Sequence, residues 1–599
     1  MNKAFKSIWS DARQSFVTTS EIQCSHGKRS KTSVSLGVAA VLLAAGGLAS
    51  AAYVETGVLG DKASWETAEY NYNWGLGAMN ASSAYALGFY GQNTTTGVMD
   101  SGAWLGNPDL DSPRITATHV TGVYGSTGNR YPQSIYATIQ KGVTPTAGEG
   151  QPFTECEEFD VKGDYTLGLN DAHGTQVTGV IGAERNGEYG HGVAFKADVV
   201  VGNTGATDNN NYGPFQDYNY YFKGYKALAD AVNAGNGEYR GGMVNNSYGT
   251  NTKIYSSGGH RLTPDEMSDL LAGNGSYERA AAAYSVTFSG DYSFLGLDDV
   301  PGADQYSANP SAFEWEYMYF KLKYGDKPSF LDGAYDAVKG TNVILSWAAG
   351  NQDRGTPYLK GLYPYFHPEA EKNWLNAVGV MQTHDDNDQY MQATYCKAGL
   401  AKWWSMAGPT AYPGIGTTYV TNQLEDGRVT TTGFNGTSAS DPQISGAFTV
   451  LQSRYPSMTA IQVKDVMYTT ASHIGANGQP FTNWTAAEGT PDVIYGWGMP
   501  DLEKGMYGPG QFLDHFEYRL AEPLDVWSND ITEAGLQQRE KEDKAWMAAT
   551  KNGTDPDAGG EYTLGDDIVV LDGNLDFYDN AVSPEQAKKW RAEYYAARA

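Results

Sequence analysis

The sequence of 599 residues has few cysteines, few cations and no long uninterrupted apolar run. Only 3 cysteines are present, and no Cys/His spacing resembles a zinc site. Lysine and arginine number 41 against 69 acidic residues, so the net charge of −28 would repel a phosphate backbone. We therefore expect no nucleic-acid partner. With 41% hydrophobic and 18% charged residues, the chain also lacks the composition of a disordered protein.

The first fifty residues differ from the rest of the chain in charge and hydropathy. Six cations and two acids precede an apolar stretch at 34–45, which ends in the small residues of 49–52. Serine and glycine interrupt this stretch, and it falls short of the ~20 apolar residues of a membrane-spanning helix. A cleaved export signal over residues 1–52 is therefore favoured over a membrane anchor or a buried N-terminal helix.

Two cysteines remain after such a leader is removed, Cys156 and Cys396. Export brings them into a compartment where disulfides form, but their spacing does not show whether they meet. A disulfide and two separate thiols are both consistent with the sequence.

From residue 96 onward, short β-branched runs alternate with helical stretches. Four of these runs lie at 97–99, 199–201, 242–245 and 342–345. Apolar runs separated by helices are typical of a parallel sheet that is covered on both faces. The sequence predicts an α/β fold with a doubly wound parallel sheet, in which functional side chains gather at the carboxyl ends of the strands.

The alternation of β-branched runs and helical stretches is interrupted by one long segment. Residues of about 250–332 are rich in Tyr, Ser, Gly and Asn, and we expect a large insertion there with helices near 264–272 and 312–323. The helical pattern resumes at 335–338. Further on, Thr459 and Gln462 form the capping-box pattern that starts another helix.

The composition changes again beyond residue 510. A charge-rich stretch at 537–544 precedes two β-type runs around an Asp-Gly-Asn turn within 566–578. A capped helix is predicted from Ser583, with Pro584 at its first position. We expect residues 511–599 to form a small C-terminal extension, the possible start of a stalk.

A serine stands where a helix of small residues is predicted to begin. Ser438 follows Gly436 and Thr437, so it lies at a helix N-terminus, where free N–H groups favour a developing negative charge. Serine is also a common helix cap, and in isolation this position favours a cap over a nucleophile. A nucleophilic serine needs a base, and the base needs an orienting group.

Three other polar residues supply these parts. Asp100 ends the first buried run, His173 begins a small-residue helix, and Asn351 follows the last of the four runs. Singly, each suits an ordinary turn or a partly buried polar position. Together they provide the acid, the base and the amide donor that acyl transfer requires.

The order and context of Asp100, His173, Asn351 and Ser438 resemble those of the subtilases, the subtilisin-like serine peptidases, over roughly residues 73–507. The resemblance implies a subtilisin-like peptidase domain over 53–510. It further implies an exported serine endopeptidase with an acyl-enzyme on Ser438, in which His173 is the base and then the acid. Asp100 would orient His173, and Asn351 would stabilise the oxyanion. No organic cofactor and no catalytic metal are implied.

Two segments resemble the substrate-binding parts of the same family. Ser247, Tyr248 and Gly249 are similar to the strand that pairs with a bound peptide. Ala348, Ala349 and Gly350 correspond to a wall of the pocket for the residue before the scissile bond. Protein or peptide substrates are expected, but the insertion at 250–332 prevents any side-chain preference from being carried over.

The leader and residues 55–76 resemble bacterial autotransporter subtilases in particular. This resemblance implies a Gram-negative host and export through the periplasm to the surface or the medium. It also implies an outer-membrane translocator as a partner, although no barrel-like series of strands is visible before Ala599. The short distance from Tyr53 to Asp100 leaves no room for a separate folding pro-domain.

The chain departs from the family pattern beside the nucleophile. Asp441 stands where the family has a small neutral residue, and Phe195 stands where it often has proline. We expect the Asp441 charge to raise the pKa of His173 and move the optimum to higher pH.

A calcium site and a function without catalysis are the two alternatives to a metal-free enzyme. The acidic run 385–388 has ligand types that suit structural Ca²⁺, but it lacks the ligand pattern of a calcium loop, so a solvated loop is favoured. The alternative function is a catalytically silent surface adhesin or binding module that keeps the scaffold and uses the Tyr-rich insertion for contact. Such a module has no need of all four catalytic residues.

Overall fold

The computed structural model describes residues 5–10, 15–20, 53–126, 128–130, 151–164, 172–187, 190–204, 217–248, 328–351, 356–382, 390–392, 395–410, 434–476, 478–487, 489–507, 518–519 and 526–527. The chain divides into two units, Met1–Glu55 and Thr56–Ala599. In the first unit, β1 (Phe5–Ser10) pairs antiparallel with β2 (Ser15–Ser20). Within the described ranges, no helix combines the length and the apolar character needed to cross a membrane.

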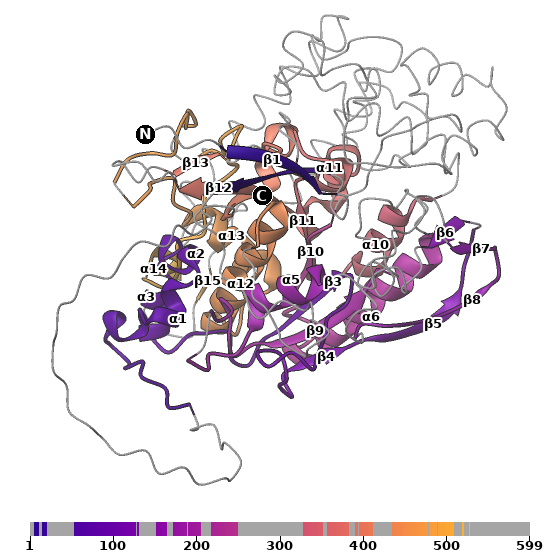
Figure 1. The fold of residues 1–599 in the computed structure, drawn as a ribbon, viewed down its shortest axis with the longest axis horizontal. Helices are drawn as coiled ribbons and strands as arrows, with labels where there is room; N and C mark the ends of the chain where they lie inside the picture. Colours follow the sequence, from indigo (N-terminus) through magenta and orange to yellow (C-terminus); the bar gives the residue numbers. More distant parts are fainter. Residues whose placement is uncertain are drawn as a thin grey trace, which may run out of the picture. The chain divides into compact units, whose positions relative to one another are not determined.

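An eight-stranded sheet forms the centre of the second unit (Figure 1). Its strand order is β13-β12-β11-β10-β3-β9-β4, with β14 paired to β12, and every pairing is parallel except that of β12 with β13. Strands β3, β10 and β11 are buried along their whole length because both faces of the sheet are covered. The strands are β3 (Thr95–Asp100), β4 (Ile115–Ala117), β9 (Asp198–Asn203), β10 (Gly242–Asn246), β11 (Val343–Ala348), β12 (Trp374–Gln382), β13 (Tyr390–Gln392) and β14 (Ser405–Pro409).

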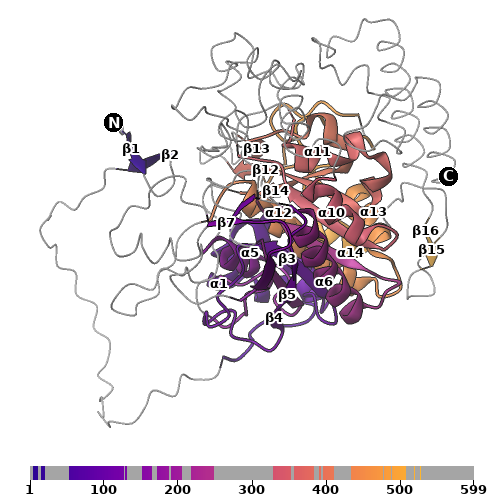
Figure 2. The same cartoon turned by 90° about the vertical axis from the view of Figure 1, so that its right-hand side faces the viewer.

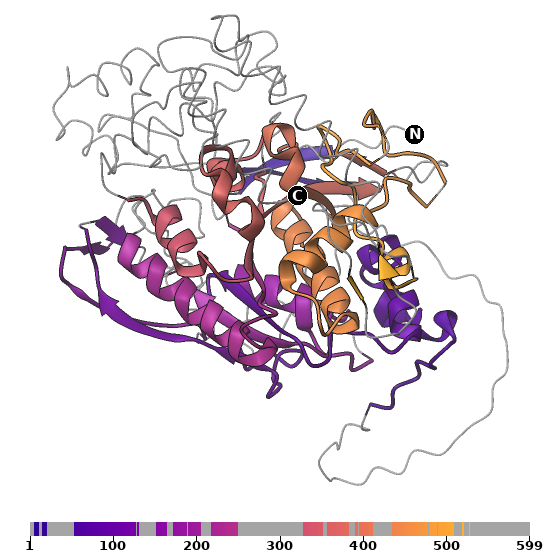
Figure 3. The same ribbon diagram turned by 180° about the vertical axis from the view of Figure 1, so that it is seen from behind.

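Helices cover the two faces of this sheet. Helices α6 (Tyr218–Asn236) and α10 (Phe330–Val338) lie together on one face. Helices α5 (His173–Gly182), α12 (Thr437–Arg454) and α13 (Ala460–Thr469) lie on the other, as the front and back views show (Figures 1 and 3). The predicted α/β class with a doubly wound parallel sheet is confirmed.

Local sequence signals set the starts of two helices. Thr459 and Gln462 form the predicted capping box at α13, and Ser329 and Asp332 form another at α10. Each box satisfies two N–H groups that the first helical turn leaves open. Helix α10 therefore begins at Phe330, just before the end expected for the insertion.

A two-stranded ribbon leaves the sheet between Asp100 and His173. Strand β5 (His119–Val123) pairs with β8 (Glu158–Lys162), and β6 (Gly128–Arg130) pairs with β7 (Gln151–Phe153). The ribbon runs beside α6 (Figure 1), and the ring centroids of Phe159 and Tyr220 lie 5.1 Å apart. The sequence pattern did not indicate this ribbon.

The base of the ribbon, which we call the neck, is fastened to the sheet. Ala103 N–H donates to the Gly163 carbonyl at 2.8 Å, and Gly163 N–H donates to the Thr118 carbonyl at 2.8 Å. A Cβ added at Gly163 would lie 1.9 Å from the Val201 carbonyl oxygen. Only glycine therefore allows the chain to pass so close to β9.

The N-terminal part of the second unit contains short helices that pack beside α14 (Leu502–Tyr507) (Figure 1; Figure 2 gives the side view of the unit). Glu503 accepts hydrogen bonds from Lys62 at 3.3 Å and from Ser83 at 3.1 Å. Asn80 donates to Asp501 at 3.1 Å. The short helices are η1 (Lys62–Trp65), α1 (Ala68–Asn71), α2 (Trp74–Ala78) and α3 (Ala81–Ala86).

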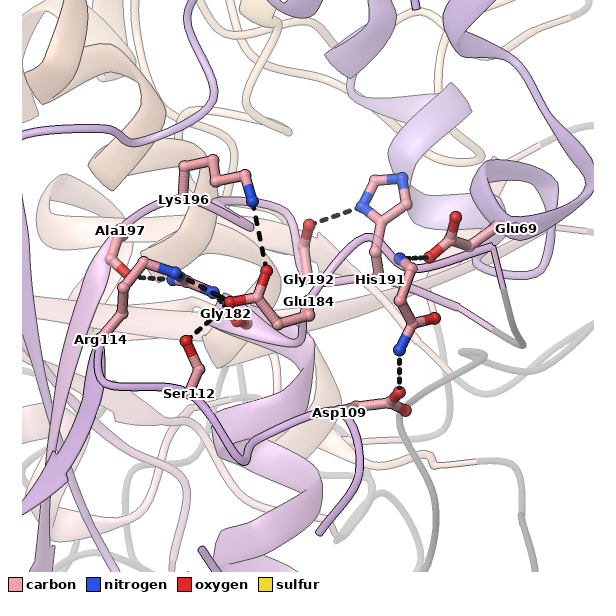
Figure 4. A network of polar contacts seen from close by, with 11 residues as sticks. Glu69, Asp109, Ser112, Arg114, Gly182, Glu184, His191, Gly192, Lys196 and Ala197 are labelled. Atoms are coloured by element: carbon pink, nitrogen blue, oxygen red, sulfur yellow. Dashed lines mark hydrogen bonds and ion pairs between the residues drawn. The ribbon is translucent and has the colours of Figure 1, made fainter. Parts of the chain in front are cut away.

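A polar network holds the chain that follows α5 (Figure 4). Glu69 accepts hydrogen bonds from the N–H groups of Asn186 at 2.9 Å and Gly187 at 3.0 Å. The Asn186 side chain donates to Asp109 at 2.7 Å. Glu69 and Asp109 thus both accept hydrogen bonds from N–H groups of the loop that follows α5.

The remaining described elements are α11 (Leu359–Phe366), η4 (Pro368–Asn373), η5 (Gly399–Trp404), β15 (Tyr518–Arg519) and β16 (Val526–Trp527). The helices expected at 264–272 and 312–323, the run 537–544, the hairpin within 566–578 and the helix from Ser583 lie outside the described residues. Cys156 is exposed, Cys396 is buried, and they are not joined by a disulfide.

Candidate active site

Asp100 and His173 meet at the carboxyl edge of the sheet. Asp100 is the last residue of β3 and His173 the first residue of α5. His173 Nδ1 lies 2.8 Å from Asp100 Oδ1, which also accepts the Ser101 N–H at 2.8 Å. Asp100 is fully buried, whereas the His173 side chain is 22% exposed. The contact orients the imidazole through its Nδ1 atom, as an acid that holds a general base does.

The start of α5 approaches the end of β3 closely. A Cβ added at Gly174 would lie 2.2 Å from the Gly102 carbonyl oxygen and 3.1 Å from Asp100. Gly174 N–H donates to the Ser101 hydroxyl at 3.0 Å. The Phe434 ring meets the His173 ring edge-on, with centroids 5.3 Å apart. The glycine thus permits the contact, and the aromatic ring restricts the tilt of the imidazole.

Ser438 lies in the first turn of α12 and is 8% exposed. Its hydroxyl donates to the backbone carbonyl of Ser247 at 2.7 Å. Gly436, at φ +80, turns the chain into the helix in a conformation that favours glycine. The turn places Ser438 beside the free N–H groups of the helix terminus, as the sequence predicted.

Asn351 is exposed and is linked to the same helix terminus. Its Oδ1 accepts hydrogen bonds from Thr437 N–H at 2.8 Å and from the Thr437 hydroxyl at 2.9 Å. A Cβ at Gly436 would lie 2.9 Å from Asn351 Nδ2. Because Oδ1 is occupied by two donors, the amide presents Nδ2 as its hydrogen-bond donor. Sequence reasoning had missed Thr437, although it directly precedes Ser438.

The two segments expected to bind substrate follow neighbouring parallel strands. Ser247 and Tyr248 come after β10, and both side chains are buried, so only their backbone can pair with a peptide. Ala348 ends β11, and the Ala349 carbonyl accepts the Tyr358 N–H at 2.9 Å. Gly350 N–H donates to the Thr437 hydroxyl at 3.1 Å. Gly249 lies outside the described residues.

Asp441 lies one turn beyond Ser438 and is fully buried. Burial raises the pKa of its carboxyl to about 7. The full negative charge expected from the sequence is therefore present only above neutral pH. This environment could not be read from the sequence, because it depends on the strands that pack against the helix.

The described residues contain no group of three or more His, Cys, Asp or Glu side chains able to hold a metal ion. The acidic run 385–388, considered for Ca²⁺, lies outside them. A solvated loop at 385–388, rather than a structural calcium site, therefore stays a prediction.

Comparison with known families agrees with this arrangement. A sequence profile of the subtilase family matches residues 91–498. A second profile, the extended signal peptide of the type V secretion system, matches residues 1–50. The extended leader is thereby confirmed, and the chain is exported through the periplasm toward the cell surface.

Two curated relatives and one solved structure illustrate the similarity. The chain is 25% identical over 488 residues to an extracellular serine protease of Serratia marcescens, covering 77% of this chain and 36% of that protein. It is 21% identical over 459 residues to the autotransporter lipoprotein NalP of Neisseria meningitidis, covering 72% and 34% respectively. The structure of fervidolysin from Fervidobacterium pennivorans matches at a TM-score of 0.37 and 15% identity, over 75% of this chain and 49% of that one. The chain spans about a third of the length of both curated relatives.

Proposed function

This chain belongs to the subtilase family, and on that basis we propose that it is an exported serine endopeptidase that hydrolyses peptide bonds through an acyl-enzyme on Ser438. The observation that carries the proposal is the 2.8 Å contact between His173 Nδ1 and Asp100 Oδ1. This contact lies at the carboxyl edge of a parallel sheet, where such folds bind their ligands, and this position also supports the proposed function.

The first step requires a turn of the Ser438 hydroxyl from the Ser247 carbonyl toward His173 Nε2. His173 accepts the proton while Ser438 Oγ attacks the substrate carbonyl carbon. Asp100 keeps the imidazole oriented and stabilises the imidazolium. Once Ser438 Oγ has turned away, the Ser247 carbonyl is available to a backbone N–H of the bound peptide.

The negative charge of the tetrahedral intermediate falls on the former carbonyl oxygen. Asn351 Nδ2 and the Ser438 N–H donate to this oxyanion. His173 then gives its proton to the leaving amine, and the C–N bond breaks. Water, deprotonated by His173, hydrolyses the acyl-enzyme by the same route and restores the Ser438 hydroxyl.

Labelling by a fluorophosphonate probe tests the assignment, because the probe phosphonylates an activated serine. We expect wild type to be labelled, Ser438→Ala to be unlabelled and His173→Ala to be labelled very slowly. Ser440→Ala is the matched control, since it removes a buried hydroxyl from the same helical turn. Labelling of Ser438→Ala at the wild-type rate would refute the assigned nucleophile.

The alternative is a catalytically silent adhesin or binding module on the same scaffold. Folded wild type that resists the probe, yet binds a surface ligand, would establish it. For the active enzyme we propose protein or peptide substrates and an outer-membrane translocator as a partner in export. Profiling cleavage of a peptide library would define the side-chain preference.

A further inference from the structure

Asp441 is the polar group beside the nucleophile to which the proposed reaction assigns no role. It lies three residues after Ser438 in α12, and its carboxyl group accepts hydrogen bonds from the ends of two neighbouring strands. Asn246, the last residue of β10, donates its N–H at 3.2 Å, and Ser247, the residue after the strand, donates its hydroxyl at 3.4 Å. From β11 comes the Ser346 hydroxyl. One buried carboxyl group thus joins α12 to the carboxyl ends of two strands.

These strand ends also carry the groups around the nucleophile. Ser247 uses its side chain for Asp441 and its backbone carbonyl for the Ser438 hydroxyl. Ser346 lies on the strand that leads to Asn351. A shift of α12 relative to either strand would therefore change the distance from Ser438 to the oxyanion donor.

We propose that Asp441 is a positioning residue, which locks the first turn of α12 onto β10 and β11 and so sets Ser438 relative to Asn351 and His173. The inference rests on the proposed function. In this proposal Asp441 positions the nucleophile Ser438, whereas the carboxyl group of Asp100 orients His173.

The neighbours of Asp441 accommodate either protonation state of its carboxyl group. A hydroxyl both donates and accepts, so Ser247 and Ser346 can donate to the carboxylate or receive the proton of the neutral acid. The Asn246 N–H donates in both states. Burial raises the pKa of Asp441 to about 7, despite the hydrogen bonds that lower it. The positioning contacts therefore persist on both sides of neutrality.

Two titratable groups interact with Asp441 from other elements. Asp100 on β3 raises the pKa of Asp441 through like charge, and Tyr225 on α6 stays protonated because burial raises its pKa. The direct contacts on β10 and β11 are uncharged. When Asp441 ionises, it adds negative charge near Asp100, and the protonated form of His173 becomes more favourable.

Three variants separate positioning from charge. Asp441→Ala removes all the contacts. Asp441→Asn keeps an oxygen for the Asn246 N–H and an amide for Ser346, and it resembles the neutral acid at every pH. Ser445→Ala is the matched control, because Ser445 lies one turn further along α12, where its hydroxyl is 3.0 Å from the side-chain amide of Asn245 on β10.

The test measures the second-order rate of fluorophosphonate labelling of the full chain between pH 5.5 and 9.5. We expect Asp441→Ala to be labelled at least tenfold more slowly at every pH, with Ser445→Ala close to wild type. Asp441→Asn should match wild type below neutrality. Above neutrality, its apparent pKa for the base should be lower than that of wild type by about one unit.

Different results overturn different claims. Absence of labelling in folded wild type would overturn the proposed function and this inference with it. If wild type is labelled and Asp441→Ala is labelled at the same rate, only the positioning role of Asp441 is overturned. If Asp441→Ala does not fold, Ser346→Ala decides, because it removes the contact of Asp441 to β11 and keeps the carboxyl group. Labelling of Ser346→Ala at the wild-type rate at every pH would then overturn the positioning role, and slower labelling at every pH would support it.

Discussion

Asn351 and Thr437 are joined by two hydrogen bonds to one atom, since Asn351 Oδ1 accepts both the N–H and the hydroxyl of Thr437. This pairing ties the proposed oxyanion donor, Asn351, to the residue that precedes the proposed nucleophile, Ser438. The amide therefore cannot rotate freely, and its Nδ2 is aimed before substrate arrives. Such prior orientation gives an oxyanion donor most of its effect.

Replacing Asn351 with alanine should lower kcat by about 10²–10³-fold with little change in KM, because Nδ2 acts on the transition state. Thr437→Val keeps the N–H contact and loses only the hydroxyl, so we expect a smaller loss of about tenfold. Steady-state kinetics with a peptide amide substrate measure the loss of kcat in Asn351→Ala and in Thr437→Val. A KM effect larger than the kcat effect in Asn351→Ala would place the residue in ground-state binding instead.

Gly436→Ala should abolish labelling as well as lower stability. Its φ of +80 disfavours a side chain, and the added Cβ would lie 2.9 Å from Asn351 Nδ2. Gly478→Ala is the control, because Gly478 has a similar φ of +74 with nothing within 4 Å. Gly478→Ala should lose about 1 kcal/mol in thermal unfolding. Gly436→Ala should lose more, because its φ of 80 and ψ of 173 suit almost only glycine, and it alone should also lose activity. Equal labelling of the two variants would remove the steric argument.

Asp441→Asn should stabilise the fold at high pH. The carboxyl pKa is raised to about 7 from 3.8, so ionisation is easier in the unfolded chain and wild-type stability falls as pH rises from about 4 to 7. The amide does not ionise. Denaturant unfolding should show little difference at pH 4 and up to about 4 kcal/mol in favour of the variant at pH 8. If the free energies of unfolding of wild type and Asp441→Asn differ by the same amount at pH 4 and at pH 8, the raised pKa of Asp441 is contradicted.

Glu184→Gln should show the opposite dependence on pH. Burial raises the pKa of Glu184, but hydrogen bonds from Arg114 and Ser112 outweigh it, so the pKa is lowered (Figure 4). A lowered carboxyl pKa stabilises the fold above about pH 4.5 and loses this effect in acid. The variant should lose about 1–2 kcal/mol at pH 7 and much less at pH 3. Glu503→Gln, which breaks a half-exposed pair with Lys62, should change stability by less than about 0.5 kcal/mol.

The sequence predicted the parts of this molecule that depend on local patterns. Buried β-branched runs marked the inner strands, and the strand before Asp100 ends where the run ends. Thr459 and Gln462 marked a helix start, because a capping box acts within one turn. The order of Asp100, His173, Asn351 and Ser438 indicated a family, and the family profile confirms it.

Features that depend on packing between distant parts of the chain could not be predicted from the sequence. The charge state of Asp441 follows from its burial under β10 and β11, which no local pattern encodes. The orientation of Asn351 comes from Thr437, 86 positions away in the chain. The ribbon of β5 and β8 was missed because its strands are far apart in sequence.

The neck of that ribbon separates the active site from whatever lies beyond it. Asp100 and His173 are held by the sheet and by α5, and the chain between them leaves and returns through the Ala103–Gly163 contact. The Asp100–His173 contact is therefore made by elements other than the paired strands β5 and β8. We expect substitutions on the exposed positions of those two strands to leave the proposed chemistry unchanged.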